Sequence, residues 1–339
     1  MSQLYLTDSK LKVGCRDGQI TVHNLEDETD HAVPLSNVDG ISVFGCPQLS
    51  TQLIRTCMQS NIAIGYYSDE GHYFGRISSN QGVNPQRQKR QVLLTDDPEF
   101  CLVWSKRVVT AKVQNSLALL RAMADVYQFS DEELHGLRHS LDSVDAASTV
   151  DEVMGFEGNA AKSYFSCLPH LVENEGFAFK GRSSRPPKDP FNSMISYGYS
   201  LLYRNIIGAI ERHGLHPYFA YMHQLKGGHA ALASDLVEEF RAPIVDRTVL
   251  HLVNDGMVEP EDFYKNGQGA VYFKRDAAKR ITDAFSAVIV KRYPYYKADG
   301  DGKTYGFQAV LDKKILTLVD AIEHGDATLY RPVRWELSE

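Results

Sequence analysis

The fold and the site are both inferred from one stretch of the sequence, residues 214–247, GLHPYFAYMHQLKGGHAALASDLVEEFRAPIVDR. This stretch begins as a loop and continues as a helix-forming segment. Two histidines, His223 and His229, stand around a Gly-Gly pair in the loop. Imidazole and carboxylate ligands together are typical of sites for divalent metals. The segment therefore predicts half of a metal site. Its carboxylates are Asp235, Glu238 and Glu239.

Helical spacing ranks these three acids without choosing one. An apolar stripe with four-residue spacing is formed by Leu232, Leu236 and Phe240. Asp235 lies at one edge of this stripe and Glu239 borders it, whereas Glu238 points to the polar side. The spacing thus favours Asp235 or Glu239 as a ligand and predicts that Glu238 is a solvent-exposed surface acid.

A helix predicted over residues 149–168 supplies the candidate for the other half of the site. Glu157 falls within its apolar stripe, between Met154 and Ala161. Burying a bare carboxylate costs several kcal/mol, so this acid must be paired, protonated or bound to a cation. A buried salt bridge to an arginine and a functional carboxylate both remain open.

The rest of the chain predicts an α+β protein with two domains. Residues 1–90 contain short strand-like runs, a hairpin turn at Asp17-Gly18 and one helix near 49–58, which predicts a β-rich, sandwich-like dimerisation domain. Helical periodicity then dominates, which predicts an all-α catalytic domain over residues 91–339. Residues 80–100 are polar and marked by Gly and Pro, which favours a linker. Further helices are expected over residues 100–127, 190–212, 275–292 and 305–324, with a short strand at 270–273.

Composition limits the class of protein. With 339 residues, 43% of them hydrophobic, the chain is long enough to bury a sizeable core. Five scattered cysteines without a CxxC pair favour reduced thiols over disulfides or a zinc site. The sequence has no secretory signal core and no apolar run as long as a membrane span, so we expect a soluble, cytoplasmic protein that makes no membrane contact.

Nucleic-acid contacts must come from local basic patches, because the formal net charge is −7. Basic and aromatic residues alternate over residues 291–297, a mixture that suits phosphate contact and base stacking but also occurs in ordinary interface loops. The Pro-rich loop near residue 185 is a second basic segment. The candidate DNA contacts are Lys112, Arg182, Arg185, Lys188, Arg247, Lys291 and Arg292.

Several common catalytic motifs are absent from the sequence, namely GxxxxGK[ST], GxGxxG after a strand, GxSxG and HExxH. What remains is Glu157, His223 and the acids of the following helix. A Glu/His/acid set without a thiolate suits Mg²⁺ or Mn²⁺, and the imidazole favours Mn²⁺. Together with basic patches, this set predicts metal-assisted chemistry at a phosphodiester.

Four segments in order make the chain similar to a known family, the CRISPR-associated adaptation integrases of the Cas-one family. The resemblance covers nearly the whole chain and implies that Glu157, His223 and Glu238 bind the metal, with Asp235 beside them in the catalytic set. It favours Glu238 where helical spacing favours Asp235 or Glu239, and it leaves His229 as a bystander. The segments are GFEGNAAKSYF (155–165), RPPKDPFNSMISYGYSLLY (185–203), GLHPYFAYMH (214–223) and ASDLVEEFRAPIVDR (233–247).

The resemblance also implies partners and a reaction. A homodimer would assemble with the small Cas-two protein, bind a prespacer duplex, and join its 3′-hydroxyl ends to CRISPR repeat DNA next to the leader by transesterification. Water in place of the 3′-hydroxyl would give endonuclease activity at the same site. The alternatives are a non-catalytic DNA-binding scaffold, a repair nuclease outside CRISPR arrays, and a metallohydrolase of small phosphates.

Overall fold

The structure is a computed structural model that describes residues 2–68, 73–77, 79, 83–177, 179–184, 186–290, 292–293 and 305–335. The chain divides into two compact units, Met1–Gln81 and Gly82–Glu339. The sequence predicted this division after residue 90. It falls earlier because residues 85–94 form a helix that packs within the second unit, against the helix Phe307–His324.

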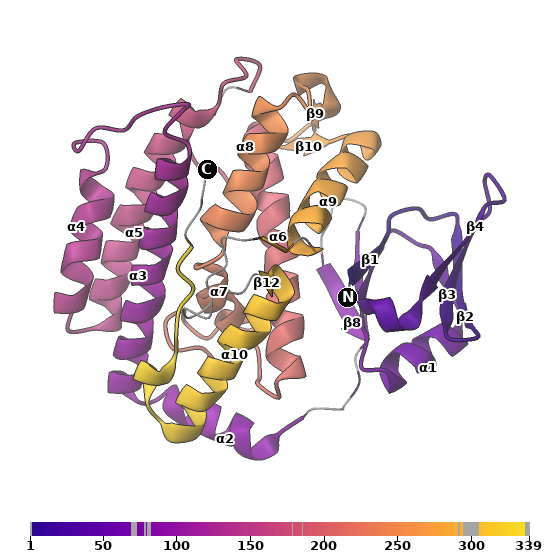
Figure 1. The fold of residues 1–339 in the computed structure, drawn as a ribbon, viewed down its shortest axis with the longest axis horizontal. Helices are drawn as coiled ribbons and strands as arrows, with labels where there is room; N and C mark the ends of the chain where they lie inside the picture. Colours follow the sequence, from indigo (N-terminus) through magenta and orange to yellow (C-terminus); the bar gives the residue numbers. More distant parts are fainter. Residues whose placement is uncertain are drawn as a thin grey trace. The chain divides into compact units, whose positions relative to one another are not determined.

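The described residues of the first unit form two four-stranded sheets, one α-helix, α1 (Thr51–Gln59), and a short 3-10 helix, η1 (Leu35–Asn37) (Figure 1). One sheet has the order β1-β5-β7-β8 and the other β4-β3-β2-β6. The strands are β1 (Ser2–Leu6), β2 (Leu11–Arg16), β3 (Gln19–Asn24), β4 (Asp30–Pro34), β5 (Val38–Phe44), β6 (Gln48–Leu49), β7 (Ala63–Tyr67) and β8 (Tyr73–Ile77).

Both sheets contribute side chains to one core, as the sandwich-like prediction requires. Ile41 and Ile64 come from the first sheet and Ile20 from the second, and all three are fully buried. The hairpin between β2 and β3 turns at Asp17 and Gly18, which have φ angles of 51° and 72°. Positive φ at both positions is what a type I′ turn needs, so this prediction is confirmed.

The second unit is helical, with two small two-stranded ribbons. Its ribbons pair β9 (Phe263–Lys265) with β10 (Val271–Phe273), and β11 (Arg292–Tyr293) with β12 (Tyr305–Gly306). Its helices are α2 (Pro85–Leu94), α3 (Pro98–Ala122), α4 (His135–Ser143), α5 (Val150–Cys167), α6 (Pro190–Arg212), α7 (Ala231–Val237), the π-helix η4 (Arg241–Asp246), α8 (Arg247–Asn254), α9 (Arg275–Val290) and α10 (Phe307–His324).

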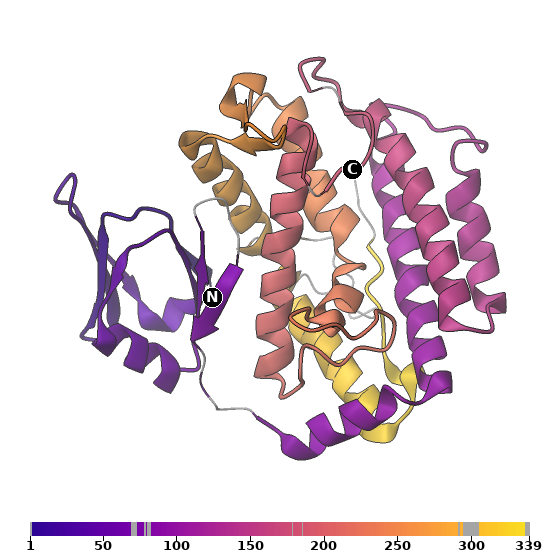
Figure 2. The same ribbon diagram turned by 180° about the vertical axis from the view of Figure 1, so that it is seen from behind.

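These helices form two groups within the unit. Helices α3, α4 and α5 pack together, while α6 runs through the middle of the unit in contact with α7, α8 and α10 (Figures 1 and 2). The helices predicted over 149–168 and 190–212 are confirmed as α5 and α6. Each begins at a capping side chain, Thr149 for α5 and Asp189 for α6. The α+β class is therefore confirmed.

Two local predictions are wrong. Helix α3 ends at Ala122 instead of continuing to residue 127. The segment 80–100 is not simply a linker, because the Asn84 side chain accepts a hydrogen bond from the Arg87 N–H and Pro85 occupies the first position of α2. Pro was taken as a mark of a linker, but an Asn-Pro pair also starts helices. Within the described residues, no helix is both long and apolar enough to cross a bilayer.

Candidate active site

Asp235 organises the site from the interior of the unit. Its side chain is fully buried on α7, and its Oδ2 accepts hydrogen bonds from the indole N–H of Trp104 at 3.0 Å and from the backbone N–H groups of Tyr221 and Met222, each at 3.1 Å. Its Oδ1 accepts from the backbone N–H of His223 at 3.0 Å. These donors satisfy the buried carboxylate, which in turn fixes the turn 221–223 on α7.

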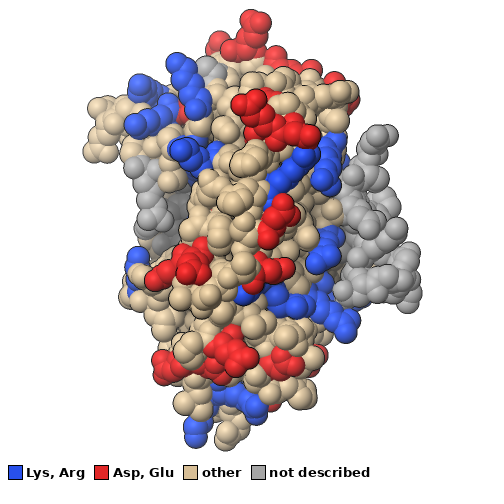
Figure 3. Space-filling model, turned by 90° about the vertical axis from the view of Figure 1, so that its left-hand side faces the viewer, with Lys and Arg blue, Asp and Glu red and all other residues tan. Residues whose placement is uncertain are grey.

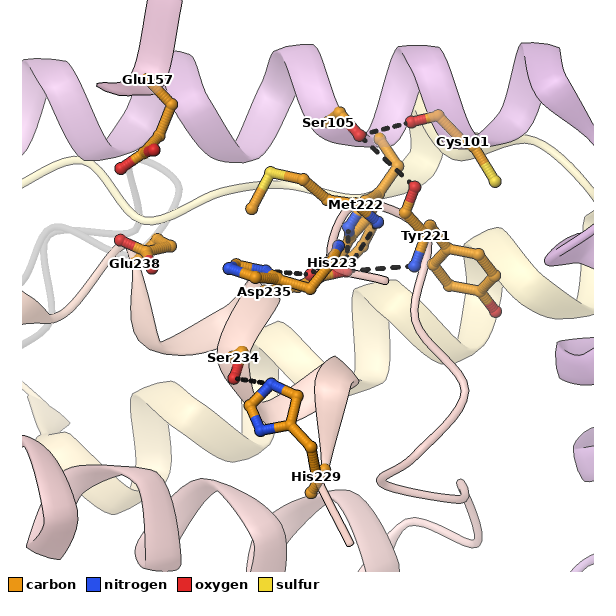
Figure 4. Close-up of polar contacts among 12 residues, drawn as sticks. Cys101, Ser105, Glu157, Tyr221, Met222, His223, His229, Ser234, Asp235 and Glu238 are labelled. Atoms are coloured by element: carbon orange, nitrogen blue, oxygen red, sulfur yellow. Dashed lines mark hydrogen bonds and ion pairs between the residues drawn. The ribbon is translucent and has the colours of Figure 1, made fainter. Parts of the chain in front are cut away.

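The same carboxylate orients the imidazole of His223. The ring Nδ1 lies 2.8 Å from Asp235 Oδ1, so Nδ1 is the donor, and in the neutral ring Nε2 keeps its lone pair. Burial alone would lower the pKa of His223, but the hydrogen bond and the negative charges of Asp235 and Glu238 outweigh it and raise the pKa. Figure 4 shows the imidazole directed toward the side of the site where Glu157 and Glu238 lie.

Helix α2 also holds this loop. The amide of the fully buried Gln91 donates to the carbonyls of His216 and Phe219, at 2.7 and 2.9 Å, and accepts from the His216 N–H at 2.8 Å. The segment predicted to be a linker therefore holds the loop that leads to His223. Nothing in its composition separated this role from that of a solvated linker.

Glu238 is buried, with 4% of its side chain exposed, so the prediction of a surface acid from helical spacing is wrong. Helix α7 ends at Val237, residues 238–240 form a turn, and η4 begins at Arg241. The spacing argument assumed that the helix has one solvated side, but every residue of α7 is buried, so the polar side also faces the interior. Burial would raise its pKa, but the positive charges of Arg241 and Lys112 lower it.

Lys112 of α3 joins the two acids of the predicted site. Its ammonium contacts the carboxylate of Glu157 on α5 and lies 2.5 Å from Glu238 Oε2. The side chains of Lys112 and Glu157 are 10% and 18% exposed. The acid in the α5 stripe is thus paired, but with a lysine in place of the arginine considered from the sequence. Trp104, Val108 and Asn115 share the buried face of α3 with Lys112, and this stripe could have identified the lysine as an inward-facing residue.

On the far side of Glu238 lies a second, partly buried network. Arg241 places its guanidinium 3.0 Å from Glu238 Oε1 and 4.8 Å from the centre of the Tyr199 ring. Asp246 accepts hydrogen bonds from the hydroxyls of Tyr164 and Tyr199, at 2.8 and 2.7 Å. Burial raises the pKa of Asp246 to about 6. Both charged residues belong to η4, and π-helical turns are frequent at functional sites.

Glu239 contacts the C-terminal segment and not the residues around His223. Its carboxylate accepts hydrogen bonds from the hydroxyl of Tyr330 and, at 2.6 Å, from the backbone N–H of Val333. The side chain is fully buried, and burial raises its pKa to about 7. Glu239 therefore anchors the C-terminal segment. Of the three acids, Asp235 and Glu238 face the His223 side of the site.

The basic residues predicted to contact DNA lie in different surroundings. The guanidinium of Arg182 donates to Asn192 Oδ1 at 2.9 Å and to Ser196 Oγ at 3.1 Å, which ties it to the start of α6. Lys188 is exposed, and Arg247 is half-buried at the start of α8. The described part of the face with α4 and α5 carries acidic and basic side chains intermixed (Figure 3). Arg185, Lys291 and the side chain of Arg292 lie outside the described residues.

His229 lies apart from these contacts, with its Nε2 3.0 Å from Ser234 Oγ. Across the described residues, no group of three or more His, Cys, Asp or Glu side chains is assembled as a ready metal site. The reason lies in the geometry, because the Lys112 ammonium stands between Glu157 and Glu238. The donor set itself suits a divalent cation: two carboxylates already share one cation, and His223 has its Nδ1 held by a carboxylate, as metal-binding histidines usually do.

Comparison with known proteins decides the family. The family model described as "CRISPR associated protein Cas1" matches residues 4–287. The chain belongs to the CRISPR-associated Cas1 family. The "CRISPR-associated endonuclease Cas1" of Mycobacterium tuberculosis is 46% identical over 326 residues, which cover 96% of this chain and 95% of that protein. A Cas1 protein of Moorella thermoacetica is 31% identical over 293 residues, covering 84% and 85%.

Solved structures agree with this fold. The Cas1 protein from Thermotoga maritima superimposes with a TM-score of 0.80 at 23% identity, covering 96% of this chain and 98% of that one. A "Casposase bound to integration product" gives a TM-score of 0.83 at 23% identity, covering 98% and 96%. The arrangement of a β-rich unit and a helical unit is thus the Cas1 fold.

Proposed function

We propose that this chain joins the 3′-hydroxyl ends of a short prespacer duplex to CRISPR repeat DNA by metal-dependent transesterification, and that Glu157, His223 and Glu238 hold the metal. As a Cas1 protein, the chain is an endonuclease and integrase of CRISPR adaptation. The site assignment and the choice of Mg²⁺ or Mn²⁺ are our proposals.

One observation supports the site above the others. Glu157 and Glu238 come from α5 and from the turn after α7, and both carboxylates meet at a single cation, the ammonium of Lys112. The imidazole of His223 lies on the same side, with its Nδ1 engaged by Asp235 (Figure 4). Two acids and an imidazole directed at one region form a donor set for Mg²⁺ or Mn²⁺.

A bound divalent cation would polarise the scissile phosphate and stabilise the leaving oxyanion. The chain's own residues prepare this chemistry. Asp235 keeps His223 in the tautomer that leaves Nε2 unprotonated, and Glu157 and Glu238 supply anionic oxygen ligands. Arg241 stays beside Glu238 and keeps that carboxylate ionised. The turn 221–223 is fixed by hydrogen bonds before any substrate arrives, which lowers the cost of positioning the reacting groups.

We infer that the partners are DNA, a second copy of this chain and the small Cas2 protein. Two structures of similar fold are a "Cas6-RT-Cas1--Cas2 complex" and a "TtCas1-DNA complex". We assign dimerisation to the β-rich unit and catalysis to the helical unit. Among the DNA contacts predicted from the sequence, exposed Lys188 and half-buried Arg247 are our candidates for contact with DNA phosphates.

Strand transfer of a labelled 3′-hydroxyl oligonucleotide into repeat DNA tests the proposal. Glu157→Gln, Glu238→Gln and His223→Asn should each abolish strand transfer in Mn²⁺ while duplex binding survives. Two matched controls are Asp151→Asn, an exposed acid on α5, and Glu239→Gln, which differs from Glu238→Gln by one position. Both controls should retain strand transfer.

The substrate can also be varied. An oligonucleotide ending in a dideoxynucleotide has no attacking hydroxyl, so joining should stop and only hydrolysis should continue. Undiminished strand transfer in Glu157→Gln and His223→Asn would refute the site. Loss of duplex binding together with activity would favour the DNA-binding scaffold instead.

A further inference from the structure

Lys112 lies at the centre of the proposed metal site. We propose that its ammonium is a built-in counter-ion, which holds Glu157 and Glu238 together without metal and is displaced when a divalent cation binds. The inference rests on the proposed function, because it concerns the same two acids. Lys112 is a positioning residue in this scheme, and it acts on the metal site in place of the DNA contact predicted from the sequence.

The ammonium of Lys112 is buried and therefore needs ionic partners. The side chain of Lys112 is 10% exposed, and it lies on a face of α3 shared with fully buried Trp104 and Val108. A buried ammonium is costly unless it is paired. In the described part of the chain, its ionic partners are Glu157 and Glu238.

The charges around the two acids already balance. Two carboxylates, Glu157 and Glu238, face two cations, Lys112 and Arg241. Adding a divalent cation to this set would leave two uncompensated positive charges in a buried site, which is strongly unfavourable. Arg241 contacts Glu238 from the opposite oxygen, at Oε1, whereas Lys112 stands between the two acids. Lys112 is therefore the cation that must leave.

Space leads to the same conclusion. The Lys112 ammonium lies 2.5 Å from Glu238 Oε2 and contacts Glu157 Oε1. Because Mg²⁺ binds oxygens at about 2.0–2.1 Å, an ion shared by these oxygens would claim the volume that the ammonium fills. The lysine can move toward solvent, since Lys112, Glu238 and Arg241 line a small pocket that is partly open to solvent. Its four-carbon stem is flexible enough to move there.

Two other roles for Lys112 make different predictions about metal affinity. If the ammonium stayed and supported the ligands in the loaded site, removing it would weaken metal binding. If it only contacted DNA phosphates, removing it would leave metal affinity unchanged when no DNA is present. Metal affinity in the absence of DNA therefore separates all three roles.

The experiment is a Mn²⁺ titration of the full chain without DNA, at one fixed pH, with free Mn²⁺ followed by electron paramagnetic resonance. We expect Lys112→Met to lower the apparent Kd for Mn²⁺ by about tenfold or more, because a competing charge is gone. The matched control is Lys106→Met on the same helix, since the Lys106 ammonium donates to the Asp145 carbonyl away from the site. Its Kd should equal that of the wild type.

Thermal unfolding supplies a second readout. Lys112→Met should have a lower Tm than the wild type without metal, and added Mn²⁺ should raise its Tm by more. Lys112→Gln keeps a polar group and repeats both tests if the methionine variant fails to fold. An unchanged or higher Kd in the lysine variants would overturn this inference alone. A wild-type chain that binds no Mn²⁺ would overturn the proposed metal site, and the inference with it.

Discussion

The carboxylate of Asp235 and the imidazole of His223 form one rigid unit, in which Asp235 Oδ1 accepts from both the backbone N–H and the ring Nδ1 of His223. Asp235 is fully buried, whereas a quarter of the His223 side chain is exposed. The pair therefore extends from the core to the edge of the site. It gives Asp235 a positioning role beside the proposed ligands that does not require Asp235 to bind the metal.

Replacing Asp235 with asparagine tests this unit. An amide nitrogen would face N–H donors now satisfied by a carboxylate oxygen, so Asp235→Asn should lower the free energy of unfolding by about 3 kcal/mol. Because Asp235 would no longer fix the orientation and tautomer of the His223 imidazole, strand transfer should fall about 10- to 100-fold. Urea unfolding and the strand-transfer assay measure the two effects.

The control for Asp235→Asn uses an exposed pair of the same types. His251 Nδ1 lies 3.7 Å from Asp255 Oδ2, and the two side chains are 50% and 61% exposed. Asp255→Asn should change stability by less than about 0.5 kcal/mol. Equal losses in both variants would contradict a special role for Asp235.

His223 makes stability depend on pH in a defined direction. Because its pKa in the folded state is raised above the ordinary 6.5, the charged pair with Asp235 contributes fully below pH 6.5. This contribution disappears as pH rises through the raised folded pKa. His223→Asn should remove the dependence, so the difference in unfolding free energy between wild type and variant should shrink with rising pH. A difference that grows with pH would contradict the raised pKa.

Metal binding should show the opposite trend. A ligand imidazole must be neutral, so Mn²⁺ affinity of the wild-type chain should increase as pH rises through the same range. Titrations of Mn²⁺ at several pH values measure this. An affinity independent of pH over that range would argue against His223 as a ligand.

Glu239 predicts a second pH effect, unconnected with catalysis. Its pKa is raised from 4.5 to about 7, so between these values the folded state binds more protons than the unfolded state. Stability should therefore fall as pH rises from 4.5 to 7, by an amount on the order of 3 kcal/mol. Glu239→Gln should abolish this fall and retain strand transfer. Unfolding curves at a series of pH values provide the measurement, and an unaltered profile in the variant would contradict it.

Arg182 and Lys188 were grouped as DNA contacts, and the structure separates them. Arg182 is tied to Asn192 and Ser196, so Arg182→Ala should destabilise the start of α6 by about 1–3 kcal/mol. Lys188 is exposed, so Lys188→Ala should leave stability unchanged and weaken duplex binding, with a smaller dependence of affinity on salt. Equal effects of the two variants on stability would contradict this separation.

Regular periodicity and capping chemistry made much of the fold predictable. The hairpin at Asp17-Gly18, the helix with Glu157 in its apolar stripe and the helix opened by Asp189-Pro190 all follow from local rules. Glu238 could not be placed by spacing, because α7 is buried on all sides and has no solvated face. The resemblance to Cas1 proteins supplied that residue.

Contacts between distant parts of the chain were beyond local rules. Gln91 holds the loop before His223 across more than one hundred residues, and Glu239 pairs with Tyr330 and Val333 near the C-terminus. Lys112 was predicted to contact DNA because it is a basic residue on a helix. Its position on the apolar face of that helix was not taken into account. A lysine in an apolar stripe needs a buried partner, as Glu157 does, and the two residues form an ion pair with each other.

Anomalous diffraction from crystals of this chain soaked in Mn²⁺ would show directly which side chains bind the metal. We expect a single region of anomalous density in contact with Glu157, His223 Nε2 and Glu238, with the Lys112 ammonium moved away, and no density at Glu239. Density elsewhere in the helical unit, or an ion held by Asp235 and Glu239 in place of Glu238, would contradict it.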